Sequence, residues 1–180
     1  YPGTSYVGEL FVADIGIPRK LLELPSLKSS IFNIDDIKDF LPIRALEAYK
    51  GSCGRVLVIA GSLGMTGAAT LATAATLRAG AGMVTVGIGK SLNEQLAVRL
   101  TETLTLPLAQ NENGSLNEDC IDEIRNNILE KKIDAVVVGP GLGRQHETQK
   151  IITELITEID KPLVIDADGL VAISEQNISF

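Results

Sequence analysis

The amino-acid sequence predicts an α/β fold built on a mostly parallel sheet. Short apolar runs of strand length alternate along the chain with longer segments of helical composition, and this alternation is typical of right-handed strand–helix–strand crossovers. The apolar runs are unbroken, as expected of strands that are buried on both faces. Aromatic residues make up only 4% of the chain, and the apolar content is mostly Leu, Ile, Val and Ala. Such a composition suits helices packed on a buried sheet.

The expected elements follow one another in a regular order. The strand segments are 55–60, 83–88, 103–108, 134–139 and 162–165, and the helical segments are 68–79, 92–100, 116–132 and 147–159. The apolar run Arg55–Ala60 opens this pattern, and Gly80-Ala81-Gly82 ends the first helix. No internal repeat interrupts the alternation.

The chain before Lys50 has a different character. Residues 4–13 have the β-rich composition of a strand, and 19–24 predict a short helix. Residues 25–33 contain Pro, Ser and Lys and are typical of a linker. Another short helix is expected over 34–40, with Asn33 as its N-cap.

Charge and cysteine content exclude several classes of partner. With 16 Lys and Arg against 23 Asp and Glu, the net charge is −7, whereas binding to a nucleic acid backbone needs clustered basic residues. No apolar stretch approaches the roughly 18–20 residues that span a membrane. Cys53, Cys120 and the single His146 lack zinc-ligand spacing. We therefore expect reduced thiols, a cytoplasmic location, and neither a nucleic-acid nor a membrane partner.

Two glycine-rich segments follow expected strands, at the end of the sheet where open α/β proteins bind ligands. They are Gly61–Ala68 (GSLGMTGA) and Gly139–Gly143 (GPGLG). Glycine lets the backbone approach a ligand closely, and the helix that follows offers free N–H groups to an anion. Each segment also fits a tight turn that serves only packing. The first is neither a Walker loop nor a dinucleotide fingerprint.

A pair of carboxylates, Asp166 and Asp168, follows the strand at 162–165. A carboxylate in this position can hold Mg²⁺ through water, orient a substrate or accept a proton. Asp168 also precedes an expected helix and is suited to be its N-cap. Weaker candidates are Lys50, Arg55 and His146.

Four motifs, in order and at matching spacing over about residues 35–175, resemble those of the NAD(P)H-hydrate dehydratase family. They are Lys50-Gly51 with Gly54–Ser62, Met65–Ala69 with Leu77–Val84, Val138–Gly143, and Asp166–Leu170. Residues 6–18 look like the end of an NAD(P)H-hydrate epimerase domain. The resemblance implies a three-layer ribokinase-like fold with a mostly parallel central sheet, truncated here. It divides the chain into an epimerase end (1–24), a linker (25–33) and the N-terminal part of the dehydratase domain (34–180).

The resemblance also implies an activity, which is the repair of hydrated NADH and NADPH. The S hydrate is dehydrated at the expense of ADP or ATP with Mg²⁺, and an epimerase that uses K⁺ converts the R hydrate to the S form. A cytoplasmic homo-oligomer, a tetramer, is expected. The implied substrate-binding residues are Gly67, Ala68, Gly139, Gly141, Gly143, Asp166 and Asp168.

The sequence departs from the family in two respects. The family's His-Pro-Gly-Glu motif and its Gly-Thr-Gly-Asp anion hole, with the presumed catalytic Asp, do not occur in these residues. The catalytic groups are therefore expected beyond Phe180, in a longer polypeptide of which this chain is a fragment that holds the front part of the dehydratase domain. Tyr49 stands where many relatives have His before the Lys-Gly pair.

Three alternative interpretations remain at this stage. One is a small-molecule kinase of the same fold, acting on a thiazole or a vitamin. Another is a nicotinamide-dependent dehydrogenase, although its glycine fingerprint is missing from the first strand–helix unit. The last is a fragment or binding module without activity of its own.

Overall fold

A computed structural model describes residues 2–27, 34–38, 40–41 and 43–176 of the chain. The chain divides into two units, Tyr1–Pro42 and Ile43–Phe180. The second unit contains the whole sheet and both hydrophobic clusters described below.

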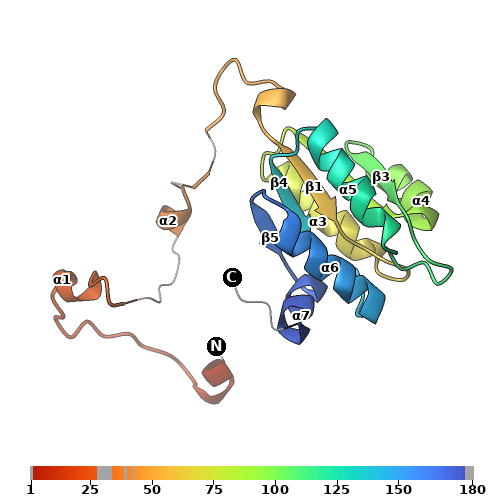
Figure 1. Cartoon of the computed structure of the whole chain (residues 1–180). Coiled ribbons are helices and arrows are strands. Elements are labelled where there is room, and N and C mark those ends of the chain that lie inside the picture. Colours follow the sequence, from red (N-terminus) through yellow and green to blue (C-terminus); the bar gives the residue numbers. More distant parts are fainter. Residues whose placement is uncertain (1, 28–33, 39, 42, 177–180) are drawn as a thin grey trace. The chain divides into compact units, whose positions relative to one another are not determined.

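A five-stranded sheet, parallel throughout, forms the centre of the second unit (Figure 1). Its strands are β1 (Arg55–Ile59), β2 (Met83–Gly89), β3 (Leu104–Leu108), β4 (Ala135–Val138) and β5 (Leu163–Ile165). They lie in the order β3-β2-β1-β4-β5. All five strands lie within the segments that the apolar runs predict, apart from the last residue of β2, so the predicted parallel α/β fold is confirmed.

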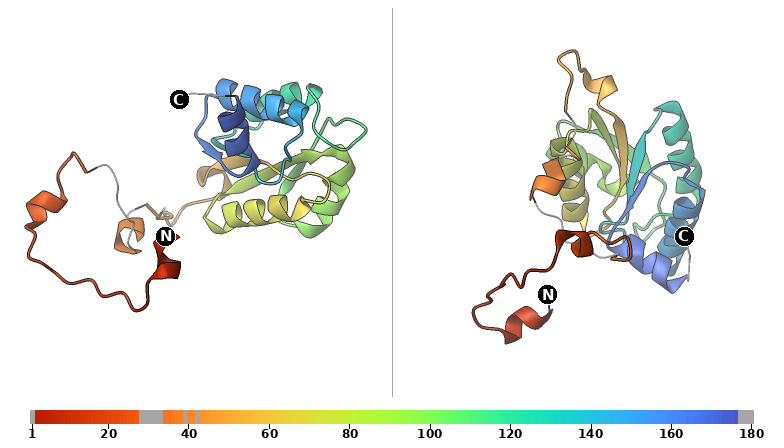
Figure 2. Two further views of the ribbon diagram at one scale, coloured as in Figure 1. Left: turned by 90° about the horizontal axis from the view of Figure 1, so that it is seen from below. Right: turned by 90° about the vertical axis from the view of Figure 1, so that its left-hand side faces the viewer.

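Helices cover both faces of this sheet (Figure 2). They are α3 (Thr66–Arg78), α4 (Asn93–Arg99), α5 (Asp119–Glu130), α6 (His146–Glu158) and α7 (Asp168–Glu175), with short 3₁₀ helices at Lys50–Ser52 and Lys90–Leu92. Helices α3 and α4 lie on one face, and α5, α6 and α7 lie on the other. The result is a three-layer α/β/α arrangement, as expected.

Strand β1 shows how the sequence fixes these layers. Its side chains point alternately to opposite faces: Leu57 and Ile59 join the cluster with α5, α6 and α7, whereas Val58 belongs to the cluster with α3 and α4. All three are 0% exposed. Burial of such a side chain contributes about 1.5–3 kcal/mol, and a strand buried on both faces must be apolar at every position.

The strand order places a topological switch between β1 and β4. From β1 the chain moves outward through β2 to β3, and it then returns to build β4 and β5 on the opposite side of β1. The connection after β1 leads to α3 on one face, whereas the connection after β4 leads to α6 on the other. Connections that diverge in this way leave a crevice at the carboxyl ends of the two strands.

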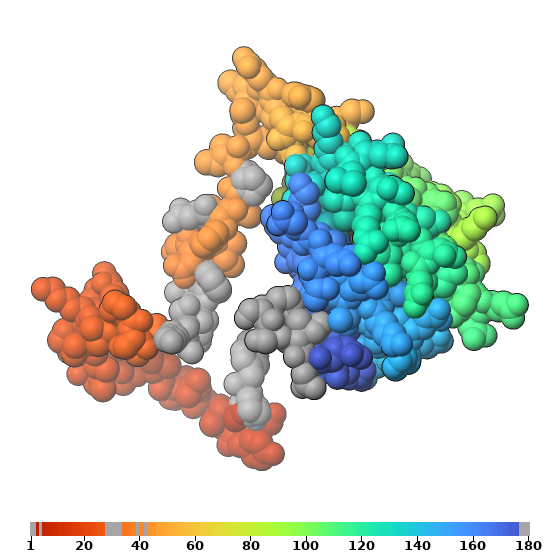
Figure 3. Space-filling view, in the orientation of Figure 1, coloured from red at the N-terminus to blue at the C-terminus, as the bar shows by residue number. Residues whose placement is uncertain are grey.

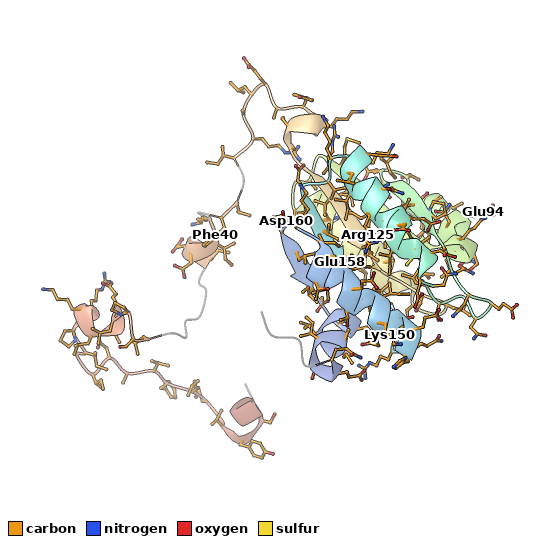
Figure 4. All side chains as sticks on the ribbon, viewed as in Figure 1. Phe40, Glu94, Arg125, Lys150, Glu158 and Asp160 are labelled. Carbon is orange, nitrogen blue, oxygen red and sulfur yellow. The ribbon has the colours of Figure 1, made fainter. Side chains whose placement is uncertain are left out.

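Helix α5 begins at Asp119, three residues later than the sequence predicts. The reason is local, because Leu116 forms an antiparallel bridge with Gln110 and closes the loop that follows β3. In the middle of α5, Arg125 makes ion pairs with Glu154 (3.2 Å) and Glu158 of α6. The labelled side chains of Arg125 and Glu158 lie close together in Figure 4, and the two helices run side by side on the surface in Figure 3.

The first unit has no strand within its described residues, so the predicted strand over 4–13 is wrong. A 3₁₀ helix occupies Pro2–Tyr6, and Leu10, Phe11 and Val12 that follow it are 74%, 78% and 90% exposed. A strand requires a neighbour to satisfy its backbone hydrogen bonds, and β-rich composition alone does not supply one.

Two short helices of the first unit do form where the sequence predicts them. They are α1 (Arg19–Leu22) and α2 (Ile34–Lys38). The expected cap Asn33 and most of the expected linker lie outside the described residues. Among the helices that the structure describes, none combines the length and apolar character needed to cross a membrane.

Both cysteines are free thiols, and their surroundings differ. Cys120 on α5 is 0% exposed. Burial, reinforced by the nearby carboxylates of Glu123 and Asp119, raises the pKa of the Cys120 thiol from 9.0 to about 12. The thiolate is the reactive form, so Cys120 is inert in the folded protein.

We predict that iodoacetamide at about pH 8 labels Cys53, which is half-buried, and leaves Cys120 unmodified until the protein is unfolded. Peptide mass spectrometry with and without denaturant measures both sites. Because the folded state holds the Cys120 proton more tightly than the unfolded state, the free energy of unfolding should also fall as the pH rises above 9.0. Rapid labelling of Cys120 in the native state would contradict its burial.

Candidate active-site crevice

The loops that follow β1 and β4 are joined directly at the carboxyl edge of the sheet. The N–H of Gly61 donates a hydrogen bond to the carbonyl oxygen of Pro140 (2.8 Å). The hydroxyl of Ser62 donates to the carbonyl oxygen of Gly141 (2.8 Å). The two glycine segments singled out in the sequence therefore form one surface, as their positions after neighbouring parallel strands require.

Gly139 and Gly141 are required by packing. Gly139 has φ +126°, and a Cβ there would overlap the carbonyl oxygen of Asp166. Gly141 has φ +68°, and its Cβ would come within 2.8 Å of Cβ of Ala68 and 3.1 Å of Cβ of Met65. Any side chain at either position would push the loops apart, so the packing explanation of these glycines is correct, whatever they contact in a complex.

Gly67 is different, because a Cβ there would meet no atom within 4 Å. It lies exposed in the first turn of α3, and no side chain caps this helix at Met65. Gly143 has φ +91°, and the nearest atoms to its Cβ position are 3.8 Å away. Open space and uncapped N–H groups at the start of α3 provide a surface for a polar or anionic ligand.

Asp168 is not the N-cap of α7, contrary to the alternative that the sequence allowed. Ala167 occupies the cap position with φ 49° and ψ −116°, and Asp168 is the first helical residue. The Asp168 carboxylate points back to the loop after β4, where its Oδ2 accepts the N–H of Gly143 (2.9 Å) and its Oδ1 accepts Nε–H of Arg144 (3.2 Å). Both oxygens therefore already have partners.

Asp166 provides the free carboxylate of the pair. Its backbone is fixed, because its N–H donates to the carbonyl oxygen of Val138 (3.1 Å) and its own carbonyl accepts the N–H of Gly169 (2.9 Å). The residue is exposed, and its side chain has no hydrogen bond or ion pair within the part of the chain that the structure describes. The two aspartates thus differ in what they are free to bind.

The loop after β3 forms a further wall that the sequence analysis missed. Ser115 donates a hydrogen bond from its hydroxyl to Oε1 of Gln145 (2.7 Å), and Nδ2 of Asn111 donates to Oε2 of Glu147 (3.0 Å). The loop therefore reaches the N-terminus of α6. Its polar residues lack the glycine density or paired charges that draw attention in a sequence.

Gln149 on α6 holds the loop after β4 in place through a hydrogen bond. Its side chain is buried, with 1% exposure, and Nε2 donates to the carbonyl oxygen of Gly143 (3.1 Å). Together with Asp168, this bond holds Gly143 through both its N–H and its carbonyl group. Gln149 was not singled out in the sequence, where a glutamine within a helix carries no signal.

The weaker sequence candidates lie in different places. Arg55 begins β1 at the amino edge of the sheet, where its Nη1 donates to the carbonyl oxygen of Lys131 (2.7 Å), and Lys50 precedes it in the 3₁₀ helix. Neither reaches the crevice. His146 begins α6 at the carboxyl edge and is exposed. Among the described residues, no group of three or more His, Cys, Asp or Glu is placed to hold a metal ion.

Comparison with known proteins gives the chain a family. The family model described as NAD(P)H-hydrate dehydratase matches residues 56–180. The bifunctional NAD(P)H-hydrate repair enzyme of Moorella thermoacetica is 39% identical over 173 residues, which are 96% of this chain and 32% of that enzyme. The enzyme of the same name from Thermofilum pendens is 36% identical over 97% of this chain and 32% of its own length. The chain thus spans about a third of these relatives.

Solved structures agree in fold. A ribokinase-like superfamily protein of Enterococcus faecalis V583 has a TM-score of 0.63 and 26% identity, over 78% of this chain and 46% of that protein. The ADP/ATP-dependent NAD(P)H-hydrate dehydratase of Bacillus subtilis, crystallised with ATP and Mg²⁺, has a TM-score of 0.59 and 28% identity over 76% and 45% of the two chains. The fold is therefore ribokinase-like, and the chain belongs to the NAD(P)H-hydrate dehydratase family.

Proposed function

We propose that the complete protein repairs hydrated nicotinamide nucleotides. It dehydrates the S hydrate of NADH or NADPH, and hydrolysis of ADP or ATP drives the reaction. With ATP, the hydrate is converted to NADH, ADP and phosphate, because the phosphoryl group turns the hydroxyl of the hydrate into a leaving group. The observation that carries this proposal is the contact between the two glycine segments at the carboxyl edge of β1 and β4, in a member of the dehydratase family. A kinase or a dehydrogenase is not favoured, since the matching family model and relatives are those of hydrate repair.

The crevice suits a ligand that combines a ring with phosphate groups. Gly67 and Gly143 offer backbone without side-chain bulk, on which the hydrated ring can lie. The helices α3 and α6 begin beside it without side-chain caps, and their free N–H groups favour phosphate. Ala68, Gly139 and Gly141 complete the surface beneath the ligand, because their close packing fixes the positions of the two loops.

Asp166 supplies a carboxylate that is free to bind a metal ion or a water molecule. Mg²⁺ is usually held by one or two carboxylates together with water and substrate phosphates, and a free, exposed carboxylate at the carboxyl edge fits that requirement. When bound, the metal neutralises phosphate charge. Asp166 orients a bound water or the metal, whereas Asp168 keeps the loop in shape.

The relatives that match both the first unit (Tyr1–Pro42) and the second unit (Ile43–Phe180) are named bifunctional. On that basis we propose that residues 1–24 end an epimerase domain that uses K⁺, that 25–33 form the linker and that 34–180 begin the dehydratase domain. Apolar side chains exposed in the first unit, such as Phe11 at 78%, are then covered by that domain. A cytoplasmic homotetramer completes the proposal, and the free cysteines are consistent with a reducing compartment.

Gly67→Leu in the complete protein should raise the KM for the S hydrate by roughly tenfold to a hundredfold, because the new side chain occupies the ligand's position. The fold should be unaffected, since a Cβ at Gly67 meets nothing within 4 Å. Steady-state kinetics and thermal unfolding measure the two effects. Ala75→Leu, at an exposed position further along α3, is the matched control. An unchanged KM in Gly67→Leu would remove Gly67 from the binding surface.

Asp166→Asn should lower kcat by about a hundredfold, the usual contribution of one group that positions a proton or a metal-bound water. The same substitution at Asp160 is the control. Asp160 is also exposed, but it precedes β5 rather than following it (Figure 4). Wild-type turnover in Asp166→Asn would show that the exposed carboxylate has no part in the reaction.

The 180-residue chain alone should not dehydrate the hydrate. The family's Gly-Thr-Gly-Asp anion hole is absent from it, and a transferring phosphoryl group needs such preorganised donors. The assay follows NADH absorbance after addition of S hydrate, Mg²⁺ and ADP or ATP, with the complete protein as the positive control. Nucleotide-dependent recovery of NADH by the chain alone would place the catalytic groups within these residues.

A further inference from the structure

We propose that the guanidinium group of Arg144 binds a phosphate group of the ligand in the crevice, and that Asp168 holds it in position. Arg144 directly follows the glycine segment after β4. Its Nε–H donates to Oδ1 of Asp168 (3.2 Å), and the other oxygen of the same carboxylate accepts the N–H of Gly143 (2.9 Å). One side chain from α7 therefore fixes both the loop and the direction in which Arg144 leaves it.

The burial of the two partners is unequal. The side chain of Asp168 is 13% exposed, whereas that of Arg144 is 70% exposed. Within the described residues, the terminal nitrogens Nη1 and Nη2 of Arg144 donate no hydrogen bond. An isolated ion pair with one such exposed partner contributes little to stability, so the effect of the contact lies in orientation. It presents two free donors at the carboxyl edge of the sheet.

Two parallel N–H donors on a planar cation match the geometry of a phosphate group. Asp168 offsets the formal charge of Arg144, so the contribution comes from directed hydrogen bonds more than from net charge. The start of α6 lies two residues further on, at His146, and no side chain caps it. The nearby carboxylate of Glu147 accepts a hydrogen bond from Asn111. Arg144 and the N–H groups of α6 can therefore bind the same anion.

This inference rests on the proposed function for the source of the phosphate. Three sources share this chemistry, namely the pyrophosphate common to both hydrates, the 2′-phosphate of the NADPH hydrate alone, and the phosphates of ADP or ATP. The chemical class is the same in each case, and the kinetics of the separate ligands distinguish them.

The first experiment compares Arg144→Gln with wild type in the complete protein. We expect a KM increase of about tenfold, the effect of losing one charged hydrogen-bonding group, with kcat near wild type because binding is lost equally in the ground and transition states. A higher KM for both hydrates identifies the pyrophosphate as the group that Arg144 binds. A higher KM for the NADPH hydrate alone identifies the 2′-phosphate. A higher KM for ADP or ATP alone identifies the phosphates of that nucleotide. Arg144→Lys should recover part of the loss.

The matched control is Arg78→Gln. Arg78 is exposed in the last turn of α3, at the amino edge of the sheet, and its loss should leave every KM unchanged. Thermal unfolding should be the same for all of these variants. If Arg144→Gln leaves the KM of both hydrates and of the nucleotide unchanged, Arg144 binds no phosphate and the proposal is overturned.

The positioning role of Asp168 has its own test. Asp168→Asn keeps an oxygen for the N–H of Gly143 and removes the acceptor for Arg144. We expect it to raise the same KM as Arg144→Gln does, and the double variant to be no worse than the Arg144 variant. Two outcomes would overturn the positioning role and show that Asp168 acts directly. One is a double variant whose KM increase is the product of the increases in the two single variants. The other is a fall in kcat caused by Asp168→Asn that persists in the Arg144→Gln background.

Calorimetric titration with ADP and with NADPH separates this inference from the proposed function. Both ligands carry the phosphates in question, and neither requires turnover. Weaker binding of either ligand to Arg144→Gln than to wild type or Arg78→Gln supports the phosphate site even if wild type dehydrates no hydrate. Equal binding of both ligands, together with unchanged KM values, rejects it.

Discussion

The backbone of Gly139 passes so close to the carbonyl oxygen of Asp166 and the N–H of Gly169 that no side chain fits between them. This contact brings the loop after β4 against the start of α7. Gly141 makes the corresponding approach to Ala68, at the start of α3. The loops after β1, β4 and β5 are therefore packed so closely at Gly139 and Gly141 that neither position has room for a side chain, and the relative position of these loops depends on the two glycines.

The two hydrophobic clusters explain why those loops meet in a crevice and not in a flat edge. Leu57 and Ile59 tie β1 to the layer of α5, α6 and α7, while Val58 ties it to α3 and α4. The chain then leaves β1 toward the layer of α3 and leaves β4 toward the layer of α6. The glycines keep the diverging loops in contact at their base, and the helix N-termini are left open above them.

The sequence predicts the second unit, Ile43–Phe180, well because the patterns that indicate its strands and helices are local. An unbroken apolar run such as Arg55–Ala60 has few interpretations besides a buried parallel strand. The strand expected over 4–13 fails for the opposite reason, since pairing depends on a distant partner that composition does not reveal. For the same reason, the sequence does not predict the contacts of Arg144 or of the loop that contains Ser115. Their contacts with Asp168 and Gln145 span 24 and 30 positions.

Ala167 explains how the two aspartates on either side of it acquire different tasks. Its φ of 49° and ψ of −116° lie in a region that L-residues rarely adopt, at a cost of about 1–3 kcal/mol. The turn leaves Asp166 exposed at the end of β5 and directs Asp168 back to Gly143, where two hydrogen bonds help to offset the strain. A regular cap at Asp168 would have removed this link between β4 and α7. The strained alanine thus allows one carboxylate to build the crevice while the other remains free to act in it.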